Sequence, residues 1–306
     1  MRYRRLGRTG LEVSELGLGT AELGQDWGIA VPGEFGCPAE ADALRLLDRA
    51  VELGVNFIDT ARVYKKSEER IGRFLKSIGA DAARVHLATK VYLHKKDGPA
   101  GLRREMRQCL ERSLGALQLE CIDLVQLHSA KLEDIADSTA WEVLDKARGE
   151  GLLCYIGATF YDAEAARAAV ESGAYDTVQV TYNPLMFSAG PVIDLAAKKD
   201  VGVIVKTPLL KGAFSYKRQH LPEELRRTRE LVGEFRFLER SDQTLPQACI
   251  RYALAPPGVS TVIAGTQRVR HLEENVEAAE GALSAEEIER IAALQKSLDV
   301  GGAEVP

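Results

Sequence analysis

An acid, a phenol, an amine and an imidazole stand where short apolar runs of the chain end. Asp59 follows the apolar run 55–58, and Tyr64 comes five positions later, in a loop that leads into a helical pattern. Lys90 and His128 lie at the ends of two later apolar runs. Chemistry in parallel α/β folds collects at the carboxyl ends of the strands. The spacing therefore predicts that these four side chains share one site.

These residue types could together transfer a proton to or from a carbonyl compound. A tyrosine with a pKa of about 10 needs about 4 kcal/mol to become acidic near pH 7. An ammonium group about 4 Å away supplies roughly that amount at an effective dielectric near 20. We therefore expect Lys90 to lower the pKa of Tyr64, and Asp59 to keep Lys90 charged. His128 would be a neutral hydrogen-bonding group that orients a substrate carbonyl.

Each residue taken alone also has a structural explanation. Asp59 could cap a turn, Tyr64 could pack under its loop, and Lys90 could be a structural hydrogen-bond donor. His128 could be a core imidazole that is bonded to the backbone. Four ionisable groups at the ends of neighbouring strands are harder to explain as scaffold, so the catalytic interpretation is preferred.

The elements that position these residues alternate between apolar runs and helical patterns. The expected strands are 16–20, 55–58, 85–91, 121–128, 154–159, 177–182, 201–206 and 261–265. Helical patterns begin at residue 38 and at Ser67, and others cover 102–117, 139–148, 163–172 and 192–199. Strands without polar alternation suit a parallel sheet that is covered by helices. We predict a closed (β/α)8 barrel that holds residues 1–306 as one domain.

The ends of the chain and one long connection add to the barrel. Residues 3–14 read as a hairpin, and the connection 208–260 carries helical patterns at 223–238 and 247–254 and should partly fold over the barrel mouth. A capping box, Ser284-x-x-Glu287, predicts a final helix before a loose tail at 301–306. The Gly-rich run 16–20 lacks the third glycine of a dinucleotide fingerprint, so a Rossmann loop is rejected.

Composition excludes several classes of protein. A net charge of -5 argues against a nucleic acid or a membrane surface as partner. The five cysteines form no C-x-x-C pair and the five histidines show no ligand spacing, so we expect reduced thiols and no metal site. No apolar leader or spanning segment is apparent, and we expect a cytoplasmic protein. The oligomeric state cannot be read from the sequence.

Four segments in order resemble the aldo-keto reductase family. The similar segments are the opening hairpin 3–14, the run 56–61 with Tyr64 behind it, Thr89-Lys90, and the run 123–128 that ends at His128. The resemblance covers essentially the whole chain. It implies a catalytic tetrad of Asp59, Tyr64, Lys90 and His128, with Tyr64 as general acid. It also implies hydride transfer, without a metal, between a nicotinamide cofactor and a carbonyl or alcohol substrate.

The resemblance further implies a cofactor site along the barrel mouth. Gln179 matches the family glutamine that holds the carboxamide, and the segment from Gly265 to Asn275 matches the part that receives the adenosine end. The expected cofactor contacts are Gly19, Thr20, Asp59, Thr159, Gln179, Lys206, Gly265, Thr266, Gln267, Arg268, His271, Glu274 and Asn275. Arg268 and His271 could reach one phosphate, which favours NADP(H), with NAD(H) as the alternative.

Three positions depart from the family pattern. Phe160 stands where many members have the carboxamide asparagine, Lys206 stands near the usual stacking aromatic, and Ser129-Ala130 replaces a proline. We expect Trp27, Tyr92 and Phe160 to line the substrate pocket, and further aromatic candidates for the pocket are Phe187 and Phe214.

Two other functions stay open. A non-enzymatic subunit that senses the cofactor is one, because the family includes regulatory partners of channels. A Schiff-base lyase that uses Lys90 or Lys206 as its nucleophile is the other.

Overall fold

Eight parallel strands form a closed barrel in the computed structural model, which describes residues 1–93 and 98–298. The strands are β3 (Leu16–Gly19), β4 (Phe57–Asp59), β5 (His86–Tyr92), β6 (Ile122–His128), β7 (Leu153–Phe160), β8 (Thr177–Thr181), β9 (Gly202–Lys206) and β10 (Thr261–Gly265). Each strand pairs with the next in the chain, and β10 pairs with both β9 and β3 to close the ring. The predicted (β/α)8 barrel is confirmed.

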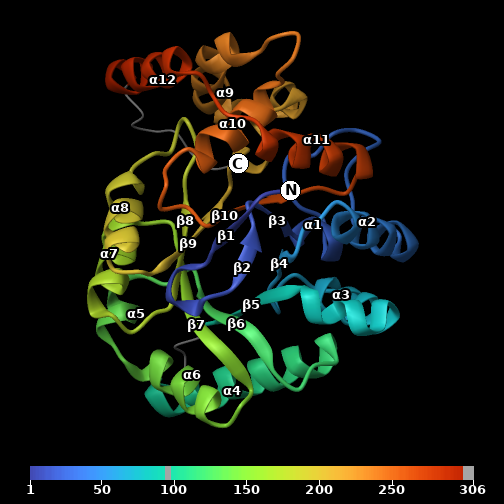
Figure 1. The fold of residues 1–306 in the computed structure, drawn as a ribbon, viewed down its shortest axis with the longest axis vertical. Helices are drawn as coiled ribbons and strands as arrows, with labels where there is room; N and C mark the ends of the chain where they lie inside the picture. The colour runs from blue at the N-terminus through green and yellow to red at the C-terminus, as the bar shows by residue number, and fades with distance from the viewer. Residues whose placement is uncertain (94–97, 299–306) are drawn as a thin grey trace.

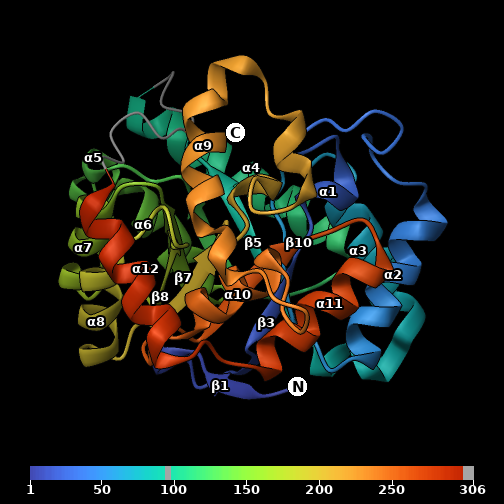
Figure 2. The same cartoon turned by 90° about the horizontal axis from the view of Figure 1, so that it is seen from above.

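Helices follow the strands and surround the barrel (Figures 1 and 2). They are α2 (Glu40–Glu52), α3 (Ser67–Ile78), α4 (Gly98–Leu117), α6 (Thr139–Gly149), α7 (Ala163–Ser172), α8 (Gly190–Lys198), α10 (Leu245–Leu254) and α11 (Val269–Glu280). Their apolar faces pack on the outer faces of the strands in one continuous core. Gly54 follows the last turn of α2 with φ of 86°, a left-handed conformation that favours glycine and turns the chain into β4.

Short elements fill the connections. They are α1 (Ala21–Gly24), α5 (Leu132–Ala136) and α9 (Arg226–Gly233), with 3₁₀ turns η1 (Gly7–Thr9), η2 (Gly79–Arg84), η3 (Leu210–Gly212), η4 (Tyr216–His220), η5 (Glu223–Leu225) and η6 (Glu234–Leu238). A longer helix, α12 (Ala285–Ser297), follows α11 after the barrel is complete. The sequence did not predict α1 or α5. The capping box at Ser284 opens α12 as expected. The tail at 301–306 lies outside the described residues.

The helix expected over 223–238 is divided into three pieces, η5, α9 and η6. Gly233 ends α9 where the chain tightens into η6. A glycine costs about 1 kcal/mol in a helix interior relative to alanine. The apolar period continues through this point, so the sequence pattern alone suggested one uninterrupted helix.

The hairpin predicted over 3–14 is present as β1 (Tyr3–Arg5) and β2 (Glu12–Ser14). It closes the end of the barrel where the strands begin. Leu6 and Val13 are buried in a second core with the inward side chains of the barrel, among them Phe57 and Ile204. Gly7 lies against the backbone of Gly202, at the start of β9. The carboxyl ends of the strands form the opposite, open end.

Candidate active site

The carboxylate of Asp59 is the centre of a buried polar cluster at the open end. Lys90 Nζ donates a hydrogen bond to Oδ1 over 2.5 Å. Two amides, Gln126 Nε2 and Gln179 Nε2, donate to Oδ2 over 3.2 and 2.8 Å. Asp59 ends β4, and its three partners come from β5, β6 and β8. Side chains from four strands therefore meet at one carboxylate. Among its three partners, Gln126 is the one that the sequence analysis did not identify.

Lys90 stays a cation in this cluster. Its Nζ also donates to the carbonyl oxygen of Thr60 over 2.8 Å and lies 5.2 Å from the centre of the Tyr64 ring. Burial alone would lower the pKa of Lys90, but Asp59 and Tyr64 raise it, and the pKa ends above the ordinary value for lysine. Lys90 therefore brings a permanent positive charge to Tyr64.

The loop that carries Tyr64 is held by close packing and by buried hydroxyl groups. Gly24 in α1 has no room for a side chain, because a Cβ atom there would overlap the carbonyl oxygen of Tyr64. Gly24 accepts a backbone hydrogen bond from Lys66 over 3.3 Å. Ser67 Oγ, at the start of α3, donates to Thr20 Oγ1 over 2.8 Å. The position of Tyr64 thus depends on α1 as well as on its own loop.

Burial decides the acidity of Tyr64 in this structure, and the expectation of a lowered pKa is wrong here. Burial raises the pKa of Tyr64 and the charge of Lys90 lowers it, with smaller contributions from Asp59 and Tyr161 that raise it. The sum lies above the ordinary tyrosine value. The charge of Lys90 favours the phenolate, but removing a phenolate from water costs more than that charge returns.

His128 is a neutral imidazole beside Tyr64. The two rings meet edge to face, with 5.9 Å between their centres and 87° between their planes. Burial, together with the charges of Lys90 and Lys206, lowers the pKa of His128 to about 3. Its buried Nδ1 has no hydrogen-bond partner among the described residues. This nitrogen is therefore left for a ligand or for water.

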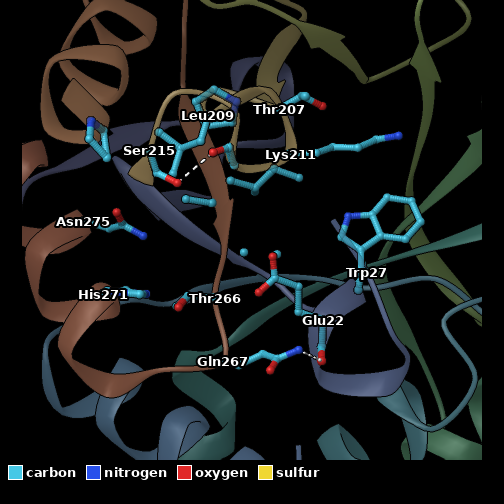
Figure 3. A pocket seen from close by; sticks show the side chains of 18 of the residues that line it. Glu22, Trp27, Thr207, Leu209, Lys211, Ser215, Thr266, Gln267, His271 and Asn275 are labelled. Carbon is cyan, nitrogen blue, oxygen red and sulfur yellow. Dashed lines mark hydrogen bonds between the residues drawn. The ribbon is translucent and has the colours of Figure 1, made fainter. Parts of the chain in front are cut away.

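A pocket of about 890 Å³ extends from this cluster along the open end of the barrel (Figure 3). In Figure 3, Thr266, Gln267, His271 and Asn275 line one side, and Trp27 and Lys211 lie across from them. All four expected catalytic residues, Trp27 and every expected cofactor contact line this one pocket. The cofactor contacts are Gly19, Thr20, Asp59, Thr159, Gln179, Lys206, Gly265, Thr266, Gln267, Arg268, His271, Glu274 and Asn275.

Two expected pocket residues lie elsewhere. Phe160 is fully buried in the core between strands and helices, and its neighbour Tyr161 lines the pocket. Side chains alternate along a strand, so Thr159 and Phe160 point to opposite faces of β7. Tyr92 is 42% exposed, and its ring contacts that of His128 from outside the pocket lining, with 5.7 Å between ring centres.

Phe187 and Phe214, the other aromatic candidates, also lie outside the pocket lining. Phe214 is buried against Phe235, and Phe187 packs on the main core. The three phenylalanine corrections share one cause, since an apolar aromatic side chain satisfies a core position as well as a pocket wall.

The segment 207–217 forms part of the pocket wall, in line with the expectation that the connection 208–260 partly folds over the barrel mouth, although none of its lining residues was expected individually. Thr207, Leu210 and Lys211 adopt positive φ angles of 60°, 47° and 51°, which is unusual for residues other than glycine. Asn183 holds the start of the segment with a hydrogen bond from Nδ2 to the carbonyl oxygen of Thr207 over 3.0 Å. Lys211 Nζ lies 5.2 Å from the centre of the Trp27 ring, so this segment lies beside the loop that carries Trp27.

Lys206 is a buried amine at the end of β9. Its Nζ lies 3.4 Å from the centre of the Tyr161 ring. Burial and the nearby charges of Lys90 and Lys211 lower the pKa of Lys206 to about 7, against a smaller opposing effect of Asp59. Lys206 was expected near the usual position of a stacking aromatic residue. The structure shows its amine there, with the ring of Tyr161 against it.

Arg268 lies at the far end of the pocket, directly before α11, and is paired with an acid. Its Nη2 lies 3.2 Å from Oε2 of Glu34, which also accepts a hydrogen bond from Tyr216 Oη over 2.6 Å. The ring of Tyr216 lies 6.2 Å from that of His271. Oε1 of Glu274 accepts a hydrogen bond from Arg270 Nε over 2.9 Å, within the same helix. The sequence identified Arg268 and His271 but not Glu34.

The open end of this α/β barrel thus presents a buried acid, lysine, phenol and imidazole in one pocket. A family model described as "Aldo/keto reductase family" matches residues 15–296. The chain belongs to the aldo/keto reductase family, and it is a pyridine-nucleotide-dependent oxidoreductase of carbonyl compounds.

Individual relatives agree with this assignment. The chain is 28% identical to the uncharacterized oxidoreductase YqkF of Bacillus subtilis over 311 residues, 95% of each chain. It is 29% identical to L-galactose dehydrogenase of Arabidopsis thaliana, covering 90% of this chain and 87% of that protein. The holo form of aldo-keto reductase AKR11C1 from Bacillus halodurans superposes with a TM-score of 0.80 at 28% identity, over 97% of both chains.

The pocket has the chemistry that a nicotinamide dinucleotide requires. Lys211, Lys217 and Arg268 supply positive charge along its length, as phosphate groups need. The helix α11 begins directly after Arg268 and has no side-chain cap at its N-terminus. His128, whose Nδ1 has no hydrogen-bond partner among the described residues, lines the same pocket. Among residues 1–93 and 98–298 no cluster of three metal-ligating side chains is present. No helix in the same ranges is long and apolar enough to cross a membrane.

Proposed function

We propose that the protein is an aldo-keto reductase that interconverts an aldehyde or ketone and the corresponding alcohol, with Tyr64 as general acid and with NADP(H) preferred over NAD(H). One observation carries this proposal. The buried Asp59–Lys90 pair lies beside Tyr64 and the neutral His128. A single pocket joins that cluster to the basic segment before α11.

Tyr64 donates the proton in the direction of reduction. A bound nicotinamide cofactor supplies the hydride when a carbonyl compound is reduced. Because the pKa of Tyr64 is raised by burial, the phenol keeps its proton at neutral pH. The developing alkoxide is a far stronger base than a phenolate and takes that proton. Lys90 then stabilises the tyrosinate that is left. Oxidation of an alcohol needs this tyrosinate at the outset, so it should require a higher pH.

His128 and Asp59 prepare the site for this step. A neutral His128 can donate one N–H to the carbonyl oxygen of the substrate, and its low pKa keeps it neutral throughout the physiological range. Asp59 keeps Lys90 charged and accepts hydrogen bonds on both oxygens, so its carboxylate is fixed. Tyr161 and Trp27 supply the aromatic surface around the reacting carbonyl.

The cofactor would lie along the pocket from Gln179 to Arg268. Gln179 would hold the carboxamide, and Lys206 would lie beside the nicotinamide ring. Thr266, Gln267, Arg268 and His271 would hold the adenosine end, and positive charge there supports a 2′-phosphate. Replacing Arg268 by Ala should weaken NADPH binding by about ten-fold and change NADH binding little. Equal losses for both cofactors would contradict the preference.

The decisive experiment separates binding from turnover. Titration of the protein with NADPH and with NADH, read by nicotinamide fluorescence, gives both dissociation constants. A panel of aldehydes, ketones and sugars with the tighter cofactor then tests for reduction. Binding without turnover of any compound would favour the cofactor-sensing subunit, and no binding of either cofactor would contradict the proposal.

A Schiff-base reaction is the second candidate, and one observation favours it. Lys206 has a pKa lowered to about 7, so a neutral, nucleophilic amine is populated at neutral pH. Lys90 is unsuitable because Asp59 holds it as a cation. Borohydride treatment with a carbonyl compound, followed by mass spectrometry, should trap an adduct that disappears in Lys206→Met. The reductase proposal expects no adduct at Lys206.

The remaining proposals concern the whole chain. Residues 1–306 would act as one domain, since strands from both ends of the sequence close the same barrel. A cytoplasmic location is supported by the five cysteines, which contain no C-x-x-C pair and are expected to be reduced thiols. The partner would be a small carbonyl or alcohol compound, and neither a nucleic acid nor a membrane, in keeping with the net charge of -5. Sedimentation analysis would determine the oligomeric state.

A further inference from the structure

Three segments that are distant in the sequence meet at the carboxylate of Glu34 on the rim of the pocket. Glu34 lies in the loop 25–39, Tyr216 lies in η4, and Arg268 directly precedes α11. Oε2 of Glu34 accepts a hydrogen bond from Tyr216 Oη over 2.6 Å and lies 3.2 Å from Arg268 Nη2. All three residues line the pocket. Glu34 therefore bridges two walls of the proposed adenosine end.

The partners of Glu34 include the side chain on which a 2′-phosphate depends. The hydrogen bond from Tyr216 is the main cause that holds the pKa of Glu34 below its usual range; burial opposes it, and the charge of Arg268 adds to the lowering. Glu34 is therefore a full negative charge at neutral pH. A phosphate that binds Arg268 must share or replace this partner, and it must approach a like charge.

We propose that Glu34 is a specificity-determining residue of the cofactor site, which weakens recognition of a 2′-phosphate by occupying Arg268. This inference rests on the proposed function, because it needs a dinucleotide in the pocket. A 2′-hydroxyl carries no charge and does not require Arg268 to leave Glu34. The presence of Glu34 therefore narrows the difference in affinity between NADPH and NADH that Arg268 alone would create.

The size of the effect follows from the exposure of the pair. The side chains of Arg268 and Glu34 are 50% and 31% exposed, so solvent screens their attraction and both can change rotamer. Loss of the ion pair and of the repulsion toward phosphate should together change affinity by about three- to ten-fold. The change should appear for the phosphorylated cofactor only.

The test measures dissociation constants of NADPH and NADH by fluorescence titration for the unmodified protein and for Glu34→Gln. Glutamine keeps the shape of the side chain and removes its charge. NADPH binding should tighten by about three- to ten-fold, and NADH binding should stay within about two-fold. Tyr216→Phe is the matched control, because it removes one hydrogen bond from Glu34 and leaves the carboxylate charged. It should tighten NADPH binding less than Glu34→Gln does.

A double variant tests the route of the effect. In an Arg268→Ala background, Glu34→Gln should tighten NADPH binding less than it does in the unmodified protein, because the repulsion toward phosphate is still relieved but no ion pair remains to be released. The inference is overturned if Glu34→Gln leaves NADPH binding within two-fold, tightens both cofactors equally, or acts as strongly without Arg268. If the unmodified protein binds neither cofactor, the proposed function fails and the inference fails with it. Binding of both cofactors with an unchanged ratio in Glu34→Gln overturns the inference alone.

Discussion

Gln179 donates a hydrogen bond to Asp59 across the open end of the barrel, with 2.8 Å between Nε2 and Oδ2. The amide that would hold the carboxamide of the cofactor is thus already engaged by the carboxylate that fixes Lys90. Asp59 also has Gln126 and Lys90 as partners, so it stays paired if Gln179 turns toward a ligand.

Gln179→Leu should therefore weaken NADPH by about three- to ten-fold, since about one net hydrogen bond is lost. An ADP-ribose compound without the nicotinamide ring is the control ligand, and its affinity should not change. Equal weakening of both ligands would mean that Gln179 only supports the barrel and does not contact the carboxamide.

Tyr64→Phe should lower kcat for carbonyl reduction by about 10² or more, the usual contribution of a positioned general acid. Its dissociation constant for NADPH should stay within a few-fold, because the change removes one hydroxyl group. Steady-state rates and fluorescence titration on the same preparation check both statements. A variant that keeps most of its activity would exclude Tyr64 as the proton donor. Lys90→Met should be similarly damaging, because it leaves the tyrosinate without its positive charge.

Gly24→Ala should disturb Tyr64 although residue 24 lies in another element. The added methyl group would overlap the carbonyl oxygen of Tyr64, so the loop must move. We expect a loss of kcat of at least ten-fold with a smaller change in cofactor affinity. Gly115→Ala is the matched control, since its Cβ meets no atom within 4 Å. Equal kcat in both variants would contradict the role of this contact.

Lys206→Met should stabilise the folded protein at neutral pH. The pKa of Lys206 falls from 10.5 to about 7 on folding, so the unfolded chain binds more protons between these values. The stability cost is therefore full below pH 7 and vanishes as the pH rises to 10.5. Thermal unfolding should show a gain of on the order of a few kcal/mol at pH 7 that shrinks toward pH 10. A gain that does not depend on pH would refute this account.

The fold was predictable because the signals for strand ends and helix starts lie within a few neighbouring residues of the sequence. Short apolar runs that end at Asp59, Lys90 and His128 placed these side chains on one edge of the barrel before any contact was known. The structure confirms the barrel and brings the residues together, while their catalytic roles stay predictions.

Three features of the site depend on residues that are distant in the sequence or on the depth of burial. Phe160 and Tyr161 differ by one position, and only the register of β7 decides which of them faces the pocket. The pairing of Glu34 with Arg268 joins residues from opposite ends of the chain, and no spacing rule connects them. The pKa of Tyr64 likewise depends on the depth of burial, which a sequence does not state.

The hairpin at the closed end of the barrel has a practical consequence. β1 and β2 cover the starts of the strands, whereas every proposed contact with a ligand lies at or beyond their carboxyl ends. A tether attached before Met1 would therefore leave from the side away from the pocket. A biosensor surface or carrier bead coupled through this end should leave ligand exchange unobstructed.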